Sequence, residues 1–163
     1  ACVKNLMGCL EPKPTPDHET ATKWEIHAEL SQCNFSDLPE YWSALSKFEH
    51  RLISLYKRLS PKLGIIDAII ASEGDAPIHG TPVYMGLVLA SENPVSCDAV
   101  AAHLMGIKSN TIGYLQLAKK QNLGEIEVKQ IETNANLQRY RRQFKLPSFI
   151  NHLYKNQIFR PHS

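Results

Sequence analysis

Two patterns of apolar positions run along this chain, one with helical spacing and one typical of buried strands. In the first pattern, apolar side chains recur every three or four positions, at Leu45, Phe48, Leu52, Leu55 and Leu59. This spacing predicts an amphipathic helix from about Glu40 to Leu59. Asp37 is the expected cap of that helix and Pro61 its stop.

The second pattern consists of two nearly uninterrupted apolar runs, Leu63–Ala71 and Val83–Ala90. Runs of this kind are typical of strands that are buried on both faces of a sheet. The polar segment 72–82, rich in glycine and proline, is the expected loop between them. A parallel pair needs a crossover of about a dozen residues, so the shorter loop favours an antiparallel pair or a wide turn.

Turn and cap signals place the remaining elements. They are a helix near 20–30, a helix Cys97–Met105 capped by Ser96 and closed by Gly106, a helix from Asn110 or Thr111 to Asn122, and a half-exposed strand over 125–131. The order predicts an α/β fold in a single domain, with a mixed central sheet flanked by helices. We expect residues 1–130 to form this α/β unit, and 131–163 to add a basic helix and an irregular tail packed on it.

Charge and composition exclude several function classes. The chain has 163 residues and a net charge of +2, with both signs mixed along most of its length. That pattern argues against nucleic-acid binding, and the Arg139, Arg141 and Arg142 cluster is interpreted as a solvated helical face. No apolar run approaches the roughly 20 residues that a membrane-spanning helix needs, and no signal peptide is visible. The expected location is the cytoplasm.

The cysteines and the start of the chain add two expectations. Cysteines 2, 9, 33 and 97 lack the spacing of zinc or iron–sulfur sites, so we expect reduced thiols and no cofactor held by this stretch alone. The sequence begins with Ala and opens in the middle of a motif. We therefore expect it to be the carboxy-terminal portion of a larger protein, whose missing amino-terminal part is its first expected partner.

Candidate chemistry gathers between the two apolar runs. Glu73, Asp75 and His79 stand among glycines that would let backbone amides approach a ligand, which suggests an anion or metal site. The alternative is a long turn whose acids cap neighbouring amides. Asp67 lies inside the first run, where a carboxylate is costly unless it is paired or at an edge.

Three further positions carry candidate side chains. Asp98 begins a predicted helix, where either capping or ligand binding accounts for an acid. Lys4 and Asn5 precede Gly8 and could bind an anion through an ammonium and an amide. His27 stands on the tryptophan-bearing face of the helix near 20–30, where packing is the plain interpretation.

Taken together, these motifs resemble a family. The matching segments, in order, are Val3-Lys4-Asn5-Leu6-Met7-Gly8, His27, Ile66-Asp67-Ala68, Glu73-Gly74-Asp75-Ala76-Pro77, Gly80-Thr81-Pro82, Leu89-Ala90-Ser91, Pro94-Val95, Asp98-Ala99-Val100-Ala101-Ala102, Met105-Gly106 and Leu123-Gly124. Over residues 2–130 the chain resembles the prokaryotic domain of unknown function family 362. The resemblance implies a shared pocket lined by Lys4, Asn5, His27, Asp67, Glu73, Gly74 and Asp98. It also implies an iron–sulfur cluster elsewhere in the full-length protein, and a redox partner.

Two functions remain open from the sequence. The first is a redox-linked or metal-assisted enzyme whose polar residues converge on one cleft. The second is a non-catalytic binding or scaffold domain attached to an iron–sulfur electron-transfer module. Geometry separates them, because an antiparallel strand pair would put Glu73 and Asp98 at opposite ends of the sheet.

Overall fold

The structure is a computed structural model of the chain, and it describes residues 2–10, 30, 33 and 36–156. These residues form a small α/β domain in which helices surround a two-stranded antiparallel sheet, so the predicted α/β class is confirmed. The elements are α1 (Cys2–Asn5), η1 (Leu6–Cys9), α3 (Leu38–Leu59), β1 (Gly64–Asp75), β2 (His79–Ser91), α4 (Pro94–Leu104), η2 (Ser109–Thr111), α5 (Gly113–Lys120), η3 (Val128–Gln130), α6 (Leu137–Tyr140) and α7 (Ser148–Lys155).

Strands β1 and β2 form one long antiparallel hairpin, as the short connection predicts. Gly64 pairs with Ser91 at one end, and Asp75 pairs with His79 beside the turn. The polar segment expected as a loop is therefore mostly strand, and only residues 76–78 form the turn. The reason is that alternating polar residues suit a strand with one face in water as well as they suit a loop.

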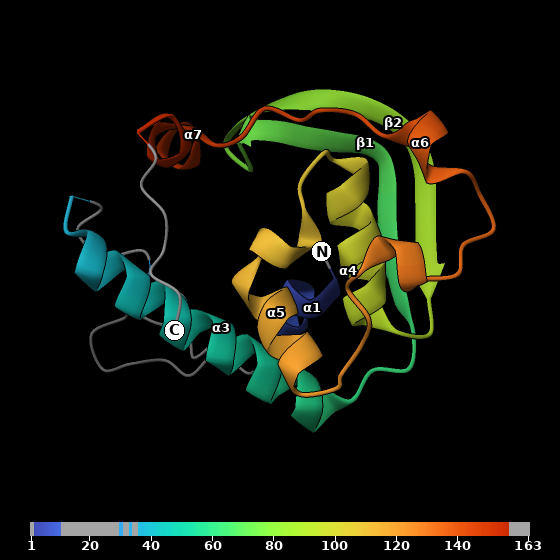
Figure 1. Cartoon of the computed structure of the whole chain (residues 1–163), viewed down its shortest axis with the longest axis horizontal. Helices are drawn as coiled ribbons and strands as arrows, with labels where there is room; N and C mark the ends of the chain where they lie inside the picture. Colours follow the sequence, from blue (N-terminus) through green and yellow to red (C-terminus); the bar gives the residue numbers. More distant parts are fainter. Residues whose placement is uncertain (1, 11–29, 31–32, 34–35, 157–163) are drawn as a thin grey trace.

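The hairpin bends sharply and curves around α4 (Figure 1). Its register shifts between Ala68 and Ile70, where the regular pairing is interrupted. Asp67 Oδ1 accepts the Ile69 N–H there at 2.9 Å, which supplies a partner to an amide inside the interruption. Bulges of this kind bend strands and increase their twist. Gly86 lies on the opposing strand with φ +64°, a conformation that glycine adopts without strain.

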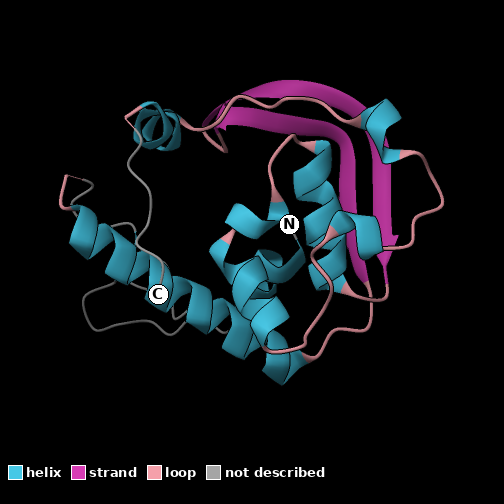
Figure 2. Ribbon diagram, in the orientation of Figure 1, coloured by secondary structure: helices cyan, strands magenta, loops and turns pink. Residues whose placement is uncertain are grey.

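The main hydrophobic core lies inside this curve, between the hairpin and α3 (Figure 2). Its buried side chains come from α1, η1, α3, α4, α5 and the segment after α5. They include Val3, Met7, Leu52, Ile53, Val95, Ala99, Leu115, Ala118 and Ile126. A second cluster joins the start of α3 to α7 through Tyr41, Ala44 and Leu153. None of the helices in the described part of the chain is long and apolar enough to cross a membrane.

The prediction that both apolar runs are buried on both faces is wrong. Ile65, Ile70, Tyr84 and Val88 are each more than 60% exposed, whereas Ile66 and Leu89 point inward and are partly covered. Helices cover only the inner face of the two-stranded sheet. No other layer of described residues covers its outer face. Apolar composition predicted strands, but it could not tell how many layers would cover them.

Local signals located most helices and misplaced some boundaries. Asp37 caps α3 as predicted, accepting the Glu40 N–H at 3.1 Å. Helix α4 is capped by Asn93 and begins at Pro94, so Ser96 is not its cap and Asp98 lies in the second turn. The predicted strand over 125–131 is absent, because this stretch forms a loop and the short helix η3. The helix expected near 20–30 lies outside the described residues, except for Leu30.

Candidate functional site

Asp98 is the most buried carboxylate among the described residues, with 2% of its surface exposed. Its Oδ1 accepts the Cys2 N–H at 2.6 Å, and its Oδ2 accepts the Val3 N–H at 3.0 Å and the Tyr114 hydroxyl at 3.0 Å. Buried carboxylates require such partners, because desolvation without them costs several kcal/mol. Asp98 therefore joins α1, α4 and α5 at one point.

The thiols of Cys2 and Cys97 lie side by side next to this carboxylate. Cys2 also contacts the Ile65 carbonyl, and Cys97 contacts the neighbouring Gly64 carbonyl. Burial, with the Asp98 charge as the next cause, raises the pKa of Cys2 to about 12. Burial also raises the pKa of Cys97. Both sulfurs are therefore neutral thiols, poor as nucleophiles at neutral pH.

Glycine at position 64 is required by this packing. A Cβ added there would lie 2.9 Å from the Cys2 sulfur and 3.0 Å from the Pro94 backbone. The start of β1 can approach α1 and α4 this closely only without a side chain. The thiol pair thus lies where α1, α4 and the start of β1 meet.

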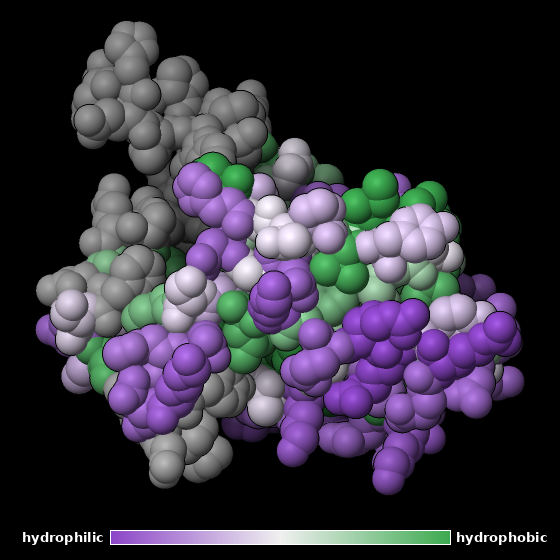
Figure 3. All heavy atoms as spheres, turned by 90° about the horizontal axis from the view of Figure 1, so that it is seen from above, coloured by the Kyte–Doolittle hydropathy of each residue, from purple (hydrophilic) through white to green (hydrophobic). Residues whose placement is uncertain are grey.

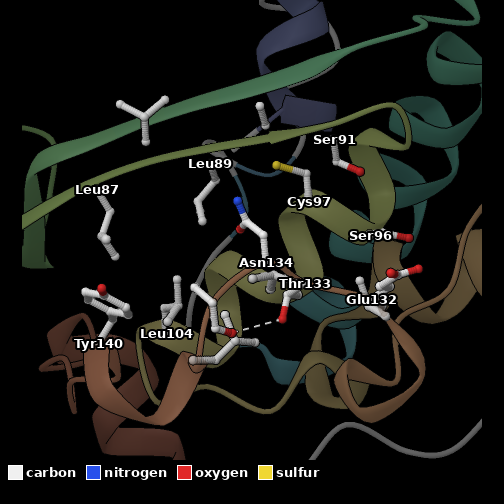
Figure 4. Close-up of a pocket in the computed structure, with 16 residues that line it drawn as sticks. Leu87, Leu89, Ser91, Ser96, Cys97, Leu104, Glu132, Thr133, Asn134 and Tyr140 are labelled. Atoms are coloured by element: carbon white, nitrogen blue, oxygen red, sulfur yellow. Dashed lines mark hydrogen bonds between the residues drawn. The ribbon is translucent and has the colours of Figure 1, made fainter.

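A pocket of about 430 Å³ adjoins this cluster on the side of β2 (Figure 4). It lies between the last part of β2, one side of α4, and the segment 131–140. Its lining residues are Leu87, Val88, Leu89, Ala90, Ser91, Ser96, Cys97, Val100, Leu104, Ile131, Glu132, Thr133, Asn134, Ala135, Leu137 and Tyr140. Its size falls within the range of small-molecule pockets.

The pocket has an apolar end and a polar end. Figure 4 shows Leu87, Leu104 and Tyr140 toward one side and Ser91, Ser96 and Glu132 toward the other, with Asn134 and Cys97 between them. Several of these polar atoms are already bonded within the protein. The Ser96 hydroxyl donates to the Glu125 carbonyl at 2.9 Å, and the Thr133 hydroxyl donates to the Ala135 carbonyl at 3.1 Å.

Glu73 and Asp75, two of the sequence candidates, hold the segment that leads into α7. Glu73 Oε2 accepts the Lys145 N–H at 2.9 Å, and its other oxygen lies 3.6 Å from the Lys145 ammonium. Asp75 accepts the Ser148 N–H at 2.7 Å and the Ser148 hydroxyl at 2.6 Å. Those hydrogen bonds lower the pKa of Asp75. Gly74, between the two acids, donates its N–H to the Lys145 carbonyl at 3.0 Å.

The other sequence candidates lie apart from one another. Lys4 and Asn5 are exposed on α1, and His79 is exposed at the turn of the hairpin. Asp67 is exposed at the register shift. His27 lies outside the described residues, so its predicted role is untested.

The antiparallel register separates Glu73 from Asp98. Helix α4 follows directly after Ser91, which pairs with Gly64, whereas Glu73 pairs with Thr81 near the turn. Roughly 30 Å of strand lies between Gly64 and Glu73, at about 3.3 Å per residue. The hairpin therefore places these two acids at opposite ends, as the sequence argument anticipated for an antiparallel pair. A ligand-binding role for either acid stays a prediction.

The described residues do not fit an iron–sulfur cluster. Such a cluster needs about four thiolate ligands, whereas Cys2 and Cys97 are a pair, Cys9 is exposed on η1, and Cys33 lies in the second core cluster. Within the same residues, no group of three or more His, Cys, Asp or Glu side chains is placed to hold a metal ion. The proposed metal role of Glu73, Asp75 and His79 stays a prediction.

The pocket residues themselves were not predicted from the sequence. The sequence predicts Leu87 and Leu89 in a buried strand, and 131–140 in the basic helix and tail that pack on the α/β unit. Their meeting depends on a contact between segments at least 40 residues apart, which no local pattern encodes. Residues 87–89 are all apolar, so the sequence carries no signal for which of these side chains face the pocket.

Comparisons with known proteins agree with the resemblance seen in the motifs. The family model described as Domain of unknown function (DUF362) matches residues 1–103. Thylakoid-associated protein sll1697 of Synechocystis sp. is 29% identical over 122 residues, which are 75% of this chain and 32% of the relative. The chain thus spans about a third of the length of that relative. No solved structure matches the chain. Because the family model covers more than half of it, this chain belongs to the family described as Domain of unknown function (DUF362).

Proposed function

We propose that this chain is a non-catalytic binding domain whose ligand is a small amphipathic molecule held in the pocket between β2 and α4. The pocket itself is the observation that supports this proposal. An apolar wall with a few polar groups at one end is the usual composition of small-molecule sites. The ligand's apolar body would lie against Leu87, Leu89 and Leu104, and its polar end would lie near Asn134 and Glu132.

The state of the neighbouring reactive groups favours binding over catalysis. Asp98 already accepts three hydrogen bonds, so it has little capacity to act as a base. Cys97 lines the pocket, but its raised pKa keeps it a neutral thiol. A nucleophile needs either a lowered pKa or an adjacent base that is free to take its proton. These side chains instead resemble a structural support beneath a binding surface.

Ligand binding can be tested with simple amphipathic probes. We expect 4-phenylbutan-1-ol to shift amide signals of residues 87–91, 96–104 and 131–140 in two-dimensional NMR spectra of the purified chain. Leu89→Trp, which fills the pocket, should weaken these shifts at least about fivefold. Tyr84→Ser on the outside of the hairpin is the matched control and should leave them unchanged. Shifts confined to residues outside the pocket, or none at all, would refute the proposal.

The proposal includes a setting for the domain in longer proteins. The family resemblance implies that such proteins carry an iron–sulfur electron-transfer module, next to which this domain would bind its ligand. The name of the Synechocystis relative describes an association of that protein with the thylakoid. Anaerobic purification of a full-length family member, followed by iron and sulfide analysis, tests this setting. Absence of both elements would remove the electron-transfer part of the proposal and leave the binding domain.

A further inference from the structure

The outer face of the hairpin is an apolar surface without a covering layer among the described residues. We define it by five side chains that point away from α4: Ile65, Ile70, Tyr84, Val88 and Ala90. Ile65 lies opposite Ala90, and Ile70 lies opposite Tyr84. Between them Val88 lies opposite Asp67, so the apolar band along this face includes one charged side chain. Their exposed fractions include 62% at Ile65, 67% at Ile70 and 76% at Tyr84.

The edges of the same hairpin are also largely unpaired. Among the described residues, the Gly74 N–H to Lys145 carbonyl bond is the only backbone hydrogen bond that joins either strand to another segment. A two-stranded ribbon with open edges and an apolar outer face is marginal by itself in water. Exposed edges are usually shortened, charged or covered. Here both strands exceed ten residues, and the outer face carries Asp67 as its one acid.

Apolar groups are visible on the surface in the view from above (Figure 3), where they adjoin a strongly hydrophilic band. Single exposed apolar side chains are ordinary on protein surfaces, whereas a contiguous band marks a contact surface. The length of the band on the hairpin, with Asp67 as its single acid, favours a second layer of protein over it.

The area of the face discriminates between possible occupants. Two strands about 4.8 Å apart and about 40 Å long present roughly 400 Å². A stable interface between separate proteins buries about 800 Å² on each partner. A second copy stacked on this face would therefore bury about half of what a stable dimer needs. A covalently connected segment escapes this limit, because it does not lose translational freedom on docking.

The Synechocystis relative is long enough to contain such a segment. The matched residues make up only 32% of the Synechocystis protein, so about two thirds of that chain lies outside the match. We propose that the outer face of the hairpin is the docking surface for a further segment of the same polypeptide in the longer proteins of this family. That segment covers the apolar band and extends the sheet at an open edge. The proposal does not depend on the pocket and its ligand.

Amide hydrogen exchange can compare the hairpin in this chain with the aligned hairpin in the full-length relative. In this chain, the amides of 65–72 and 83–90 that point to the open edges of the hairpin should exchange quickly. In the full-length Synechocystis relative, the aligned amides should exchange at least about 100-fold more slowly. Equal rates in the two proteins would overturn the proposal. Protection in this chain that increases with concentration, together with a dimer in sedimentation, would show that a second copy is the occupant and would also overturn it.

Substitutions give an independent measurement. Ile70→Lys and Tyr84→Lys should change the melting temperature of this chain by less than about 2 °C, because both side chains are exposed. The same substitutions at the aligned positions of the full-length relative should lower its melting temperature by more than about 5 °C. Leu89→Lys, on the inner face, is the sensitivity control and should destabilise both proteins. A relative that tolerates the outer-face substitutions as this chain does would contradict the docking role.

Discussion

The carboxylate of Asp98 and the hydroxyl of Tyr114, 16 residues apart, form a 3.0 Å hydrogen bond in the interior of the domain. The same carboxylate accepts the N–H groups of Cys2 and Val3. One side chain thus ties the first residues of the described chain to α4 and α5. The acid predicted as a cap or a ligand thus holds three helices together, and its ligand-binding role stays a prediction.

Removing this carboxylate should be costly. Asp98→Ala leaves two backbone donors and a hydroxyl without their acceptor, and each buried unsatisfied group costs about 1–3 kcal/mol. We expect the free energy of unfolding to fall by at least about 3 kcal/mol, measured by urea denaturation. Tyr114→Phe removes one donor and leaves the carboxylate satisfied by the other two, so its expected cost is about 1–2 kcal/mol. Equal effects of the two substitutions would contradict this arrangement.

The contact between Asp75 and Ser148 should open in acid. Because its two hydrogen bonds to Ser148 lower the pKa of Asp75 below the ordinary value of 3.8, the contact stabilises the fold above about pH 4 and is lost as the pH falls through the lowered pKa. Exchange of the Ser148 amide, followed by NMR between pH 6 and pH 2, should accelerate in that range. Asp75→Asn should abolish this pH dependence. An unchanged pH profile in that variant would assign the transition to another group.

Cys2 should be unreactive at neutral pH although its surface is partly exposed. A pKa of about 12, against the ordinary 9.0, reduces the thiolate fraction at pH 8 by about 1,000-fold. Iodoacetamide labelling mapped by mass spectrometry should therefore modify exposed Cys9 well before Cys2. Labelling of Cys2 should accelerate as the pH rises toward 12. Rapid modification of Cys2 in the folded protein at pH 8 would show that its thiol is not held neutral.

Asp67 should contribute to the bend of the hairpin. Its Oδ1 satisfies the Ile69 N–H at the register shift, so Asp67→Ala should lower the free energy of unfolding by about 0.5–1.5 kcal/mol. Asp67→Asn keeps an acceptor oxygen and should recover most of that loss. Thermal unfolding of both variants provides the measurement. If Asp67→Asn is as destabilising as Asp67→Ala, the charge of Asp67 matters more than its hydrogen bond.

Local chemistry accounts for the parts of the fold that the sequence predicts. The spacing of apolar residues in α3, the Asp37 cap and the positive φ at Gly106 depend on neighbours within a few positions. The same applies to the antiparallel hairpin, because its connection is too short for a crossover. The prediction of a strand over 125–131 is wrong, although it rests on the same local reasoning. The alternating pattern of this stretch suits a strand, but no described strand pairs with it, and Ile126 enters the core from a loop.

The sequence by itself determined the α/β class and favoured an antiparallel pairing of the two apolar runs over a crossover, since both follow from interactions between residues close along the chain. Only the tertiary structure decided what the polar candidates do. Asp98 accepts hydrogen bonds from Cys2, Val3 and Tyr114. Glu73 accepts one from Lys145, and Asp75 accepts one from the Ser148 hydroxyl. These partners lie up to 96 residues away along the chain. The tertiary structure also brought 131–140 against β2 to form the pocket. Such contacts depend on how the curved hairpin wraps α4, and the side chains have no preference for these partners until packing brings them together.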